Sequence, residues 1–201
     1  MECEAFLEAL ASKASTPGGG GAAAFAGAIG ISLGCMVGNI TAEKSKTPEA
    51  RETLSRLGGE AEALRLRLAG LVDEDARAFQ PLSEAYKLPK DAPGRDAVLE
   101  AALSAAAAVP MEIMEACARC IELFAAYEQA SSLMLLSDVG CGASLCRAAL
   151  EAAALNVYAN TRLMKEREKA DALERRVSGL LERFAPMADA VYAGVTERLK
   201  A

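Results

Sequence analysis

Residues 22–43 read AAAFAGAIGISLGCMVGNITAE, with a single charged side chain at the end. The stretch contains no proline, and it predicts one long helix that is apolar on every side and therefore buried all round. Small residues recur every four positions along it, at Ala22, Ala26, Gly30, Gly34 and Gly38. A row without bulk lets a neighbouring helix approach closely. Larger apolar side chains form a row on another side, at Phe25, Ile29, Leu33, Met36 and Ile40.

The same stretch is also long enough to span a bilayer. Between positions 22 and 40, however, it holds four glycines, five alanines, Ser32 and Asn39, and the rest of the chain is amphipathic. We therefore favour close helix packing in a protein that makes no membrane contact.

The composition of the chain extends this prediction to an all-α protein. Its 201 residues are 52% hydrophobic but only 4% aromatic, so the core is built from small and aliphatic side chains. No stretch alternates convincingly as a strand, and we expect a single domain over 1–201. The expected helices span about 2–13, 22–43, 48–86, 96–108 and 110–136, then a helix that ends near 164 and a last one from about 165. The break at 137–142, SDVGCG, places Ser137 or Asp138 as a cap of the next helix.

The composition also excludes several classes of site. Without histidine there is no Ser-His-Asp or Cys-His catalysis and no His-ligated metal, so proton transfer falls to Asp, Glu, Lys, Tyr or Cys. A net charge of −6 without a basic run makes nucleic acid an unexpected partner. The start MECEAF has acids where a signal peptide needs positive charge, so we expect a cytoplasmic protein with six free cysteines. The CARC at 117–120 is weak evidence for a redox site, and buried structural cysteines are favoured.

A run of four glycines, in STPGGGG at 15–21, precedes the long apolar helix. Free backbone N–H groups at a helix N-terminus attract anions. The run continues GAAAF instead of the GK[ST] of a phosphate loop, and no strand precedes it, so nucleotide binding is disfavoured. Two interpretations stay open here: a site for a carboxylate or polar heterocycle, or a tight entry into a buried helix.

Asp75 interrupts the apolar stripe of the third expected helix. The stripe consists of Leu64, Leu68, Leu71, Val72 and Phe79. A carboxylate on a buried stripe is unfavourable unless it is paired or faces a polar cavity, and burial raises its pKa toward the range useful for proton transfer. Asp73 and Glu74 lie off the stripe. The alternative for Asp75 is a buried ion pair with an arginine.

Asn156 and Asn160 lie four positions apart and so share one face of a later helix. They continue an apolar row that includes Leu145 and Ala149. Two amides in such a row act either as polar contacts between helices or as hydrogen-bond partners of a ligand. Both interpretations stay open.

Four segments in series resemble one family. They are STPGGGGAAAFAGAIGISLGCMVGNIT, VDEDARAF followed by EAYKLPK, AAVPMEI, and LLSDVGCGASLCRAALEAAALNVYAN. In order and spacing they resemble the cyclodeaminase domain of formiminotransferase-cyclodeaminase and its stand-alone bacterial relatives, which include methenyltetrahydrofolate cyclohydrolases. The chain departs from the family pattern at Gly21, where a serine is usual, and at TAEKSKTPE, where a Gly-Lys-rich segment with a tyrosine is usual.

The resemblance implies an up-and-down helical bundle with long central helices that forms homodimers and binds folate near the subunit interface. It implies an essential aspartate in VDEDARAF, which we place at Asp75 with Asp73 as second choice. It implies no metal and no cofactor beyond the tetrahydrofolate that carries the substrate group. We expect formiminotetrahydrofolate cyclodeaminase activity first and methenyltetrahydrofolate cyclohydrolase activity as the alternative. The first would need a separate formiminotransferase, and a non-catalytic helical interaction protein is the rival from another class.

Further residues receive hypothetical roles from the resemblance. The turn could lie against the pterin or the glutamate tail, and Asn156 and Asn160 could hydrogen-bond the pterin edge. Asp138 could bind pterin nitrogens, with a helix cap as the simpler account. The turn residues are Pro17, Gly18, Gly19 and Gly20, and the candidates for the tail carboxylates are Lys44, Lys46, Lys87 and Lys90.

Overall fold

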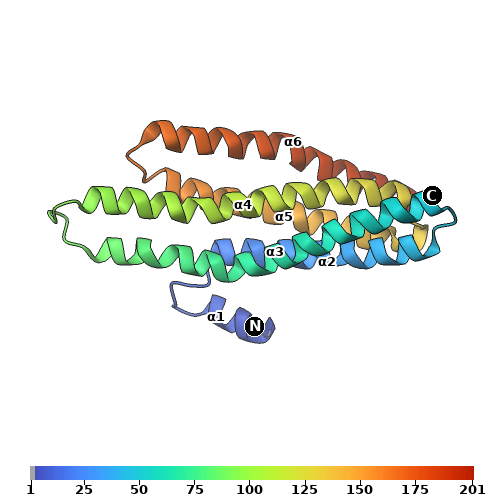
Figure 1. The fold of residues 1–201 in the computed structure, drawn as a ribbon, viewed down its shortest axis with the longest axis horizontal. Helices are drawn as coiled ribbons and strands as arrows, with labels where there is room; N and C mark the ends of the chain where they lie inside the picture. Colours follow the sequence, from blue (N-terminus) through green and yellow to red (C-terminus); the bar gives the residue numbers. More distant parts are fainter. Residues whose placement is uncertain (1–2) are drawn as a thin grey trace.

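The computed structural model describes residues 3–201, and within that range it is built from helices without a strand. Five long helices lie side by side as an up-and-down bundle, and the short α1 lies against its flank (Figure 1). Helix α2 packs against α3, α5 and α4, while α6 covers α5 and α4. The elements are α1 (Cys3–Ala11), α2 (Gly19–Lys44), α3 (Pro48–Lys87), α4 (Arg95–Ala130), the 3₁₀ turn η1 (Leu133–Leu135), α5 (Leu136–Thr161) and α6 (Arg167–Lys200). The all-α class and the bundle are confirmed.

The small-residue row of α2 packs closely on its neighbours, as the sequence predicts. A Cβ atom added to Gly30 would lie 2.8 Å from the Cys146 sulfur of α5. One added to Gly38 would lie 2.6 Å from the Tyr127 hydroxyl of α4. These separations are shorter than van der Waals contact, so only glycine lets α2 come this near to α4 and α5.

The expectation that α2 is buried all round is wrong for a single chain. Ile29 and Met36, in its row of larger side chains, are 45% and 39% exposed. By length and composition alone, α2, α4 and the segment 133–161 are apolar enough to cross a membrane, and 50–56% of each apolar window is buried inside the protein. The bundle thus leaves one stripe of its most apolar helix exposed to solvent.

Two predicted helix breaks are wrong. Helix α4 runs without interruption through Pro110 and ends at Ala130, so the two helices expected over 96–136 are one. Helix α5 includes the whole of 137–142, because Gly140 and Gly142 serve packing there: a Cβ on Gly142 would lie 3.0 Å or less from three atoms of the Phe124 ring. The N-cap of α5 is Leu135 and no side chain caps it, so the capping role of Ser137 or Asp138 is also wrong.

Helix α3 agrees with its predicted limits and carries the stripe that positions the site. Thr47 caps it by accepting a hydrogen bond from the Ala50 N–H at 3.2 Å, and Pro48 occupies its first position. Leu68 and Leu71 are fully buried in the core. The register of this buried stripe turns Asp75 inward, toward the start of α2.

All six cysteines are free thiols. Cys117, Cys120 and Cys146 are buried, and burial raises the pKa of Cys117 well above its ordinary value. For these three the structural role is the better account, because a buried thiol with a raised pKa is unreactive. Cys3 and Cys141 are exposed, contrary to a wholly buried set.

Candidate active site

The glycine turn and Asp75 form one unit. The N–H of Gly21, in the first turn of α2, donates a hydrogen bond of 2.9 Å to Asp75 Oδ2 on α3. A Cβ on Gly20 would lie 2.7 Å from that Oδ2, 2.5 Å from Cγ and nearer still to Oδ1. Any larger residue at position 20 would therefore displace the carboxylate. A Cβ on Gly21 would meet only ordinary contacts, of 3.5 Å or more.

Asp75 is a half-buried acid without a cationic partner. No lysine or arginine of residues 3–201 forms an ion pair with it, which removes the buried Asp–Arg alternative. Burial raises the pKa of Asp75, and the Gly21 N–H opposes that rise. Only Oδ2 is hydrogen-bonded within the described chain, so Oδ1 is free to meet a ligand. The Asp75 carboxylate also caps α2, whose own N-cap residue is a glycine without a side chain.

Asn156 and Asn160 of α5 lie beside the same cavity as Asp75, and each side-chain nitrogen donates to a backbone carbonyl. Asn156 Nδ2 donates to the Ala152 carbonyl at 2.8 Å. Asn160 Nδ2 donates to the Asn156 carbonyl at 2.9 Å and makes a longer contact of 3.4 Å with the Ala106 carbonyl of α4. Neither side-chain Oδ1 accepts a hydrogen bond from the described residues. The Asn160 amide thus makes a polar contact between helices, whereas Asn156 bonds within α5, and the ligand role of both oxygens stays a prediction.

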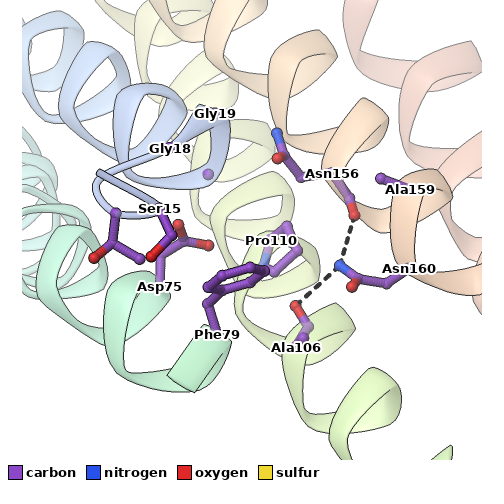
Figure 2. Close-up of a pocket in the computed structure, with 12 residues that line it drawn as sticks. Ser15, Gly18, Gly19, Asp75, Phe79, Ala106, Pro110, Asn156, Ala159 and Asn160 are labelled. Carbon is purple, nitrogen blue, oxygen red and sulfur yellow. Dashed lines mark hydrogen bonds between the residues drawn. The ribbon is translucent and has the colours of Figure 1, made fainter. Parts of the chain in front are cut away.

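These groups line a cavity of about 190 Å³ between the start of α2 and parts of α3, α4 and α5 (Figure 2). Its polar side chains are one carboxylate, two amides and two hydroxyls, with no lysine or arginine. The volume is below the ~300 Å³ at which typical ligand pockets begin, so a ring-sized part of a ligand fits inside a single chain. The lining residues are Ser15, Thr16, Gly18, Gly19, Gly20, Asp75, Phe79, Ala106, Pro110, Asn156, Ala159 and Asn160.

Comparison with known proteins identifies the family of the chain. Residues 2–179 match the family model described as formiminotransferase-cyclodeaminase. The chain belongs to that family. Similar proteins include the methenyltetrahydrofolate cyclohydrolase of Methylorubrum extorquens, 36% identical over 98% of this chain and 96% of that protein. The formimidoyltransferase-cyclodeaminase of Rattus norvegicus is 30% identical over 96% of this chain, which spans 37% of that protein's length.

A solved structure of the same family has the same fold. The crystal structure of formiminotetrahydrofolate cyclodeaminase from Thermotoga maritima superposes with a TM-score of 0.83 at 26% identity, covering 100% of this chain and 96% of that one. All three relatives are named as enzymes, and the chain is an enzyme of the formiminotransferase-cyclodeaminase family. The rival interpretation as a non-catalytic helical bundle is set aside, since its two requirements, a cationic partner for Asp75 and no opening beside the turn, are both unmet.

Most residues singled out from the family motifs meet at this cavity. Gly18, Gly19 and Gly20 line it together with Asp75 and the two asparagines. Pro17 stands just behind the turn, where its Cβ lies 3.5 Å from the position of a Cβ on Gly21.

Six further singled-out residues do not line the cavity within one chain, and two of them are Lys87 at the end of α3 and Lys90 in the loop that follows. Asp73 is exposed on the outer side of α3. Lys44 ends α2, roughly 38 Å along the helix axis from Gly19, and Lys46 follows it. Asp138 is in the first turn of α5, about 27 Å along the axis from Asn156, where an acid is favourable beside the helix dipole.

The sequence argument missed several lining residues of the cavity. Ser15 and Thr16 stand beside the glycine run but carry no pattern of their own. The sequence places Phe79 in the apolar stripe and Pro110 at the start of a helix, although both line the cavity (Figure 2). The one available signal was AAVPMEI as a shared segment, which marks Pro110 without giving its position in space. Residues 3–201 contain no group of three or more acidic or cysteine side chains suited to a metal ion.

Proposed function

We propose that the chain is a methenyltetrahydrofolate cyclohydrolase with Asp75 as its proton carrier. The observation that supports this proposal is the position of the Asp75 carboxylate. The Gly21 N–H holds its Oδ2 against the glycine turn, and its Oδ1 has no partner from the described residues in the cavity. The family supplies the chemistry, and the full-length similarity to a stand-alone cyclohydrolase supports this activity. It takes first place over the cyclodeaminase activity that the sequence alone put first.

The reaction opens the five-membered ring of 5,10-methenyltetrahydrofolate. Water attacks the methenyl carbon while the Asp75 carboxylate takes one of its protons, which gives a neutral carbinolamine. The Asp75 carboxylic acid then returns this proton to N5 as the carbon–N5 bond breaks. The remaining hydroxyl proton leaves to solvent, and 10-formyltetrahydrofolate is the product. A raised pKa suits a group that must first accept and then donate the same proton.

The charge of the cavity supports a cationic substrate. The methenyl group carries a positive charge shared between N5 and N10. The cavity lining offers a carboxylate and two free amide oxygens, and it has no cationic side chain. Such a lining stabilises a cation and disfavours an anion, so we place the N5–N10 end of the folate inside and its tail outside.

The asparagines are proposed to recognise the pterin. Because both N–H groups of Asn160 are engaged with backbone carbonyls, Asn160 presents only its Oδ1 acceptor to the cavity, whereas Asn156 presents its Oδ1 and one remaining N–H. The aminopyrimidine edge of a pterin presents N–H donors. The turn residues Pro17 to Gly20 are proposed to lie against the ring.

Formiminotetrahydrofolate cyclodeaminase activity is the second candidate, supported by the likeness to the Thermotoga maritima structure along the whole chain. N10 attacks the formimino carbon, the ring closes and ammonia leaves, so one proton must be taken from N10 and one given to the departing nitrogen. Asp75 is placed to carry both in turn. This activity would require a separate formiminotransferase to supply the substrate.

The test follows the methenyl chromophore with both substrates. With 5,10-methenyltetrahydrofolate as substrate, we expect the methenyl absorbance to fall faster than in the uncatalysed reaction. A rise of this absorbance from the formimino compound would make cyclodeaminase the first candidate. D75N should lower the rate by roughly 10²–10⁴-fold at unchanged helical content. D73N, an exposed acid two residues away, is the matched control and should keep full activity. Full turnover by D75N would refute the role of Asp75.

We also propose a homodimer with the exposed apolar row of α2 in its interface. This row presents Ile29 and Met36 to solvent without a charged side chain among them. A second copy of the chain would cover it. M36E should shift the protein to a monomer in sedimentation velocity, and L66E, on the exposed face of α3, should not. Equal masses for wild type and M36E would refute this interface.

We also propose a cytoplasmic location, which is in keeping with six free thiols.

A further inference from the structure

Pro110 leaves one backbone carbonyl of α4 without its helical partner. In an α-helix the N–H of each residue bonds to the carbonyl four positions earlier. Pro110 lies inside α4 and has no N–H, so the Ala106 carbonyl receives no such bond. Ala106 and Pro110 are both buried, and a buried carbonyl without a partner is destabilising.

Asn160 supplies the missing donor from the neighbouring helix. Its Nδ2 contacts the Ala106 carbonyl at 3.4 Å and donates to the Asn156 carbonyl at 2.9 Å, as the dashed lines in Figure 2 show. An amide nitrogen has two N–H groups, and both are then engaged. The amide is thereby fixed in one orientation, which leaves its Oδ1 as the group available to the cavity.

We propose that Pro110 is a positioning residue for ligand binding, acting through the Ala106 carbonyl on the side chain of Asn160. The proline removes the helical donor of the Ala106 carbonyl, the Asn160 amide donates to that carbonyl instead, and this holds the Asn160 oxygen toward the cavity. With an N–H at position 110, the helix would take that carbonyl for itself. Asn160 would then be free to rotate and present N–H groups to the ligand. The ligand role rests on the proposed function, whereas the link between the three residues does not.

A stability cycle tests the link without any substrate. N160A leaves the Ala106 carbonyl without a donor and should raise the unfolding equilibrium constant roughly tenfold in urea titrations. In P110A/N160A the new N–H of residue 110 takes over that carbonyl, so the double variant should be more stable than N160A. If the two changes add independently, Pro110 and Asn160 share no acceptor and the proposal is overturned.

A kinetic cycle tests the effect on binding. P110A should raise KM about fivefold, because it weakens a contact to the ligand that is made in the ground state and the transition state alike. The kcat should stay within twofold of wild type, because Asp75 is unchanged. P110A/N160A should have the KM of N160A and no more. P186A removes a proline from inside α6, away from the cavity, and should leave KM unchanged. Unchanged KM in P110A, or multiplied effects in the double variant, would overturn the positioning role.

A separate variant guards against a P110A protein that fails to fold. N160D keeps the size of the side chain and Pro110 but removes both N–H donors. It should be less stable than wild type at neutral pH, where the carboxylate faces the Ala106 carbonyl. An N160D protein as stable as wild type would show that these donors hold nothing. Inactivity of every variant, wild type included, with an intact stability cycle would refute the proposed function and leave the link standing.

Discussion

Replacement of Gly20 by alanine is the most direct test of the site, because the added methyl group would overlap the Asp75 carboxylate. The added Cβ would lie 2.5 Å from Asp75 Cγ and 2.7 Å from Oδ2, well inside contact distance. The carboxylate must therefore move away from α2 and lose its hydrogen bond to the Gly21 N–H, which is 2.9 Å long in the native chain.

The expected effects on stability and on catalysis differ in size. Loss of a hydrogen bond to a charged group lowers the free energy of unfolding by about 1.5–3 kcal/mol. The better helix propensity of alanine returns ~1 kcal/mol, so the net loss is about 0.5–2 kcal/mol. A displaced proton carrier lowers kcat by roughly 10²–10⁴-fold, which corresponds to about 3–5 kcal/mol in the transition state.

The assay compares G20A with G21A, the adjacent glycine. Loss of methenyl absorbance gives kcat, and urea titration gives the free energy of unfolding. G21A should keep kcat within a few-fold of wild type, because its Cβ meets only contacts of 3.5 Å or more. If G20A keeps full kcat, or if G20A and G21A lose activity equally, the close fit of glycine and carboxylate is not what the reaction requires.

Four further predictions concern pH, the turn and the core. Because burial raises the pKa of Asp75 and the base acts ionised, kcat/KM should rise with pH through a value above the ordinary ~3.9 and then level off; a profile flat to pH 4 would contradict this. Because burial disfavours the ionised form of Asp75, D75N should have a larger free energy of unfolding than wild type at neutral pH. Urea titrations should show this difference shrinking as the pH falls through the pKa of Asp75. G21S adds a hydroxyl beside Oδ2 and should move the acidic limb of the profile to lower pH, whereas an unmoved limb would show no contact. G142A crowds Phe124 and should lower the free energy of unfolding by about 1–3 kcal/mol, while G179A, with open space around it, should not.

The helical class and the central helix follow from local pattern alone. Glycines every fourth position in α2 predict close helix contacts whatever the partner, because their spacing already places them on one face. Asp75 was found in the same way, as an acid in register with Leu68, Leu71 and Val72. These features depend on the 3.6-residue period of the helix, and a sequence displays that period directly.

The predictions that failed concern residues whose effect depends on what lies beside them. Pro110 and the glycines of 137–142 read as breaks, yet α4 and α5 run through them. Asn160 contacts the carbonyl that the proline leaves free, and Phe124 fills the space that Gly142 leaves open. A breaker residue ends a helix only when no neighbour compensates for it, and here the neighbours are 18 positions (Gly142 and Phe124) and 50 positions (Pro110 and Asn160) away in the chain.

The sequence by itself determined the fold class, the close-packed face of α2 and the identity of the inward-facing acid. Only the tertiary structure decided that the start of α2, the middle of α3 and the end of α5 meet at one cavity, and that Lys44 and Asp138 lie far from it. The physical reason is that periodicity fixes which face of a helix is buried. Which ends of the helices coincide is set by loop lengths and by how far each helix slides along its neighbours until the side chains fit.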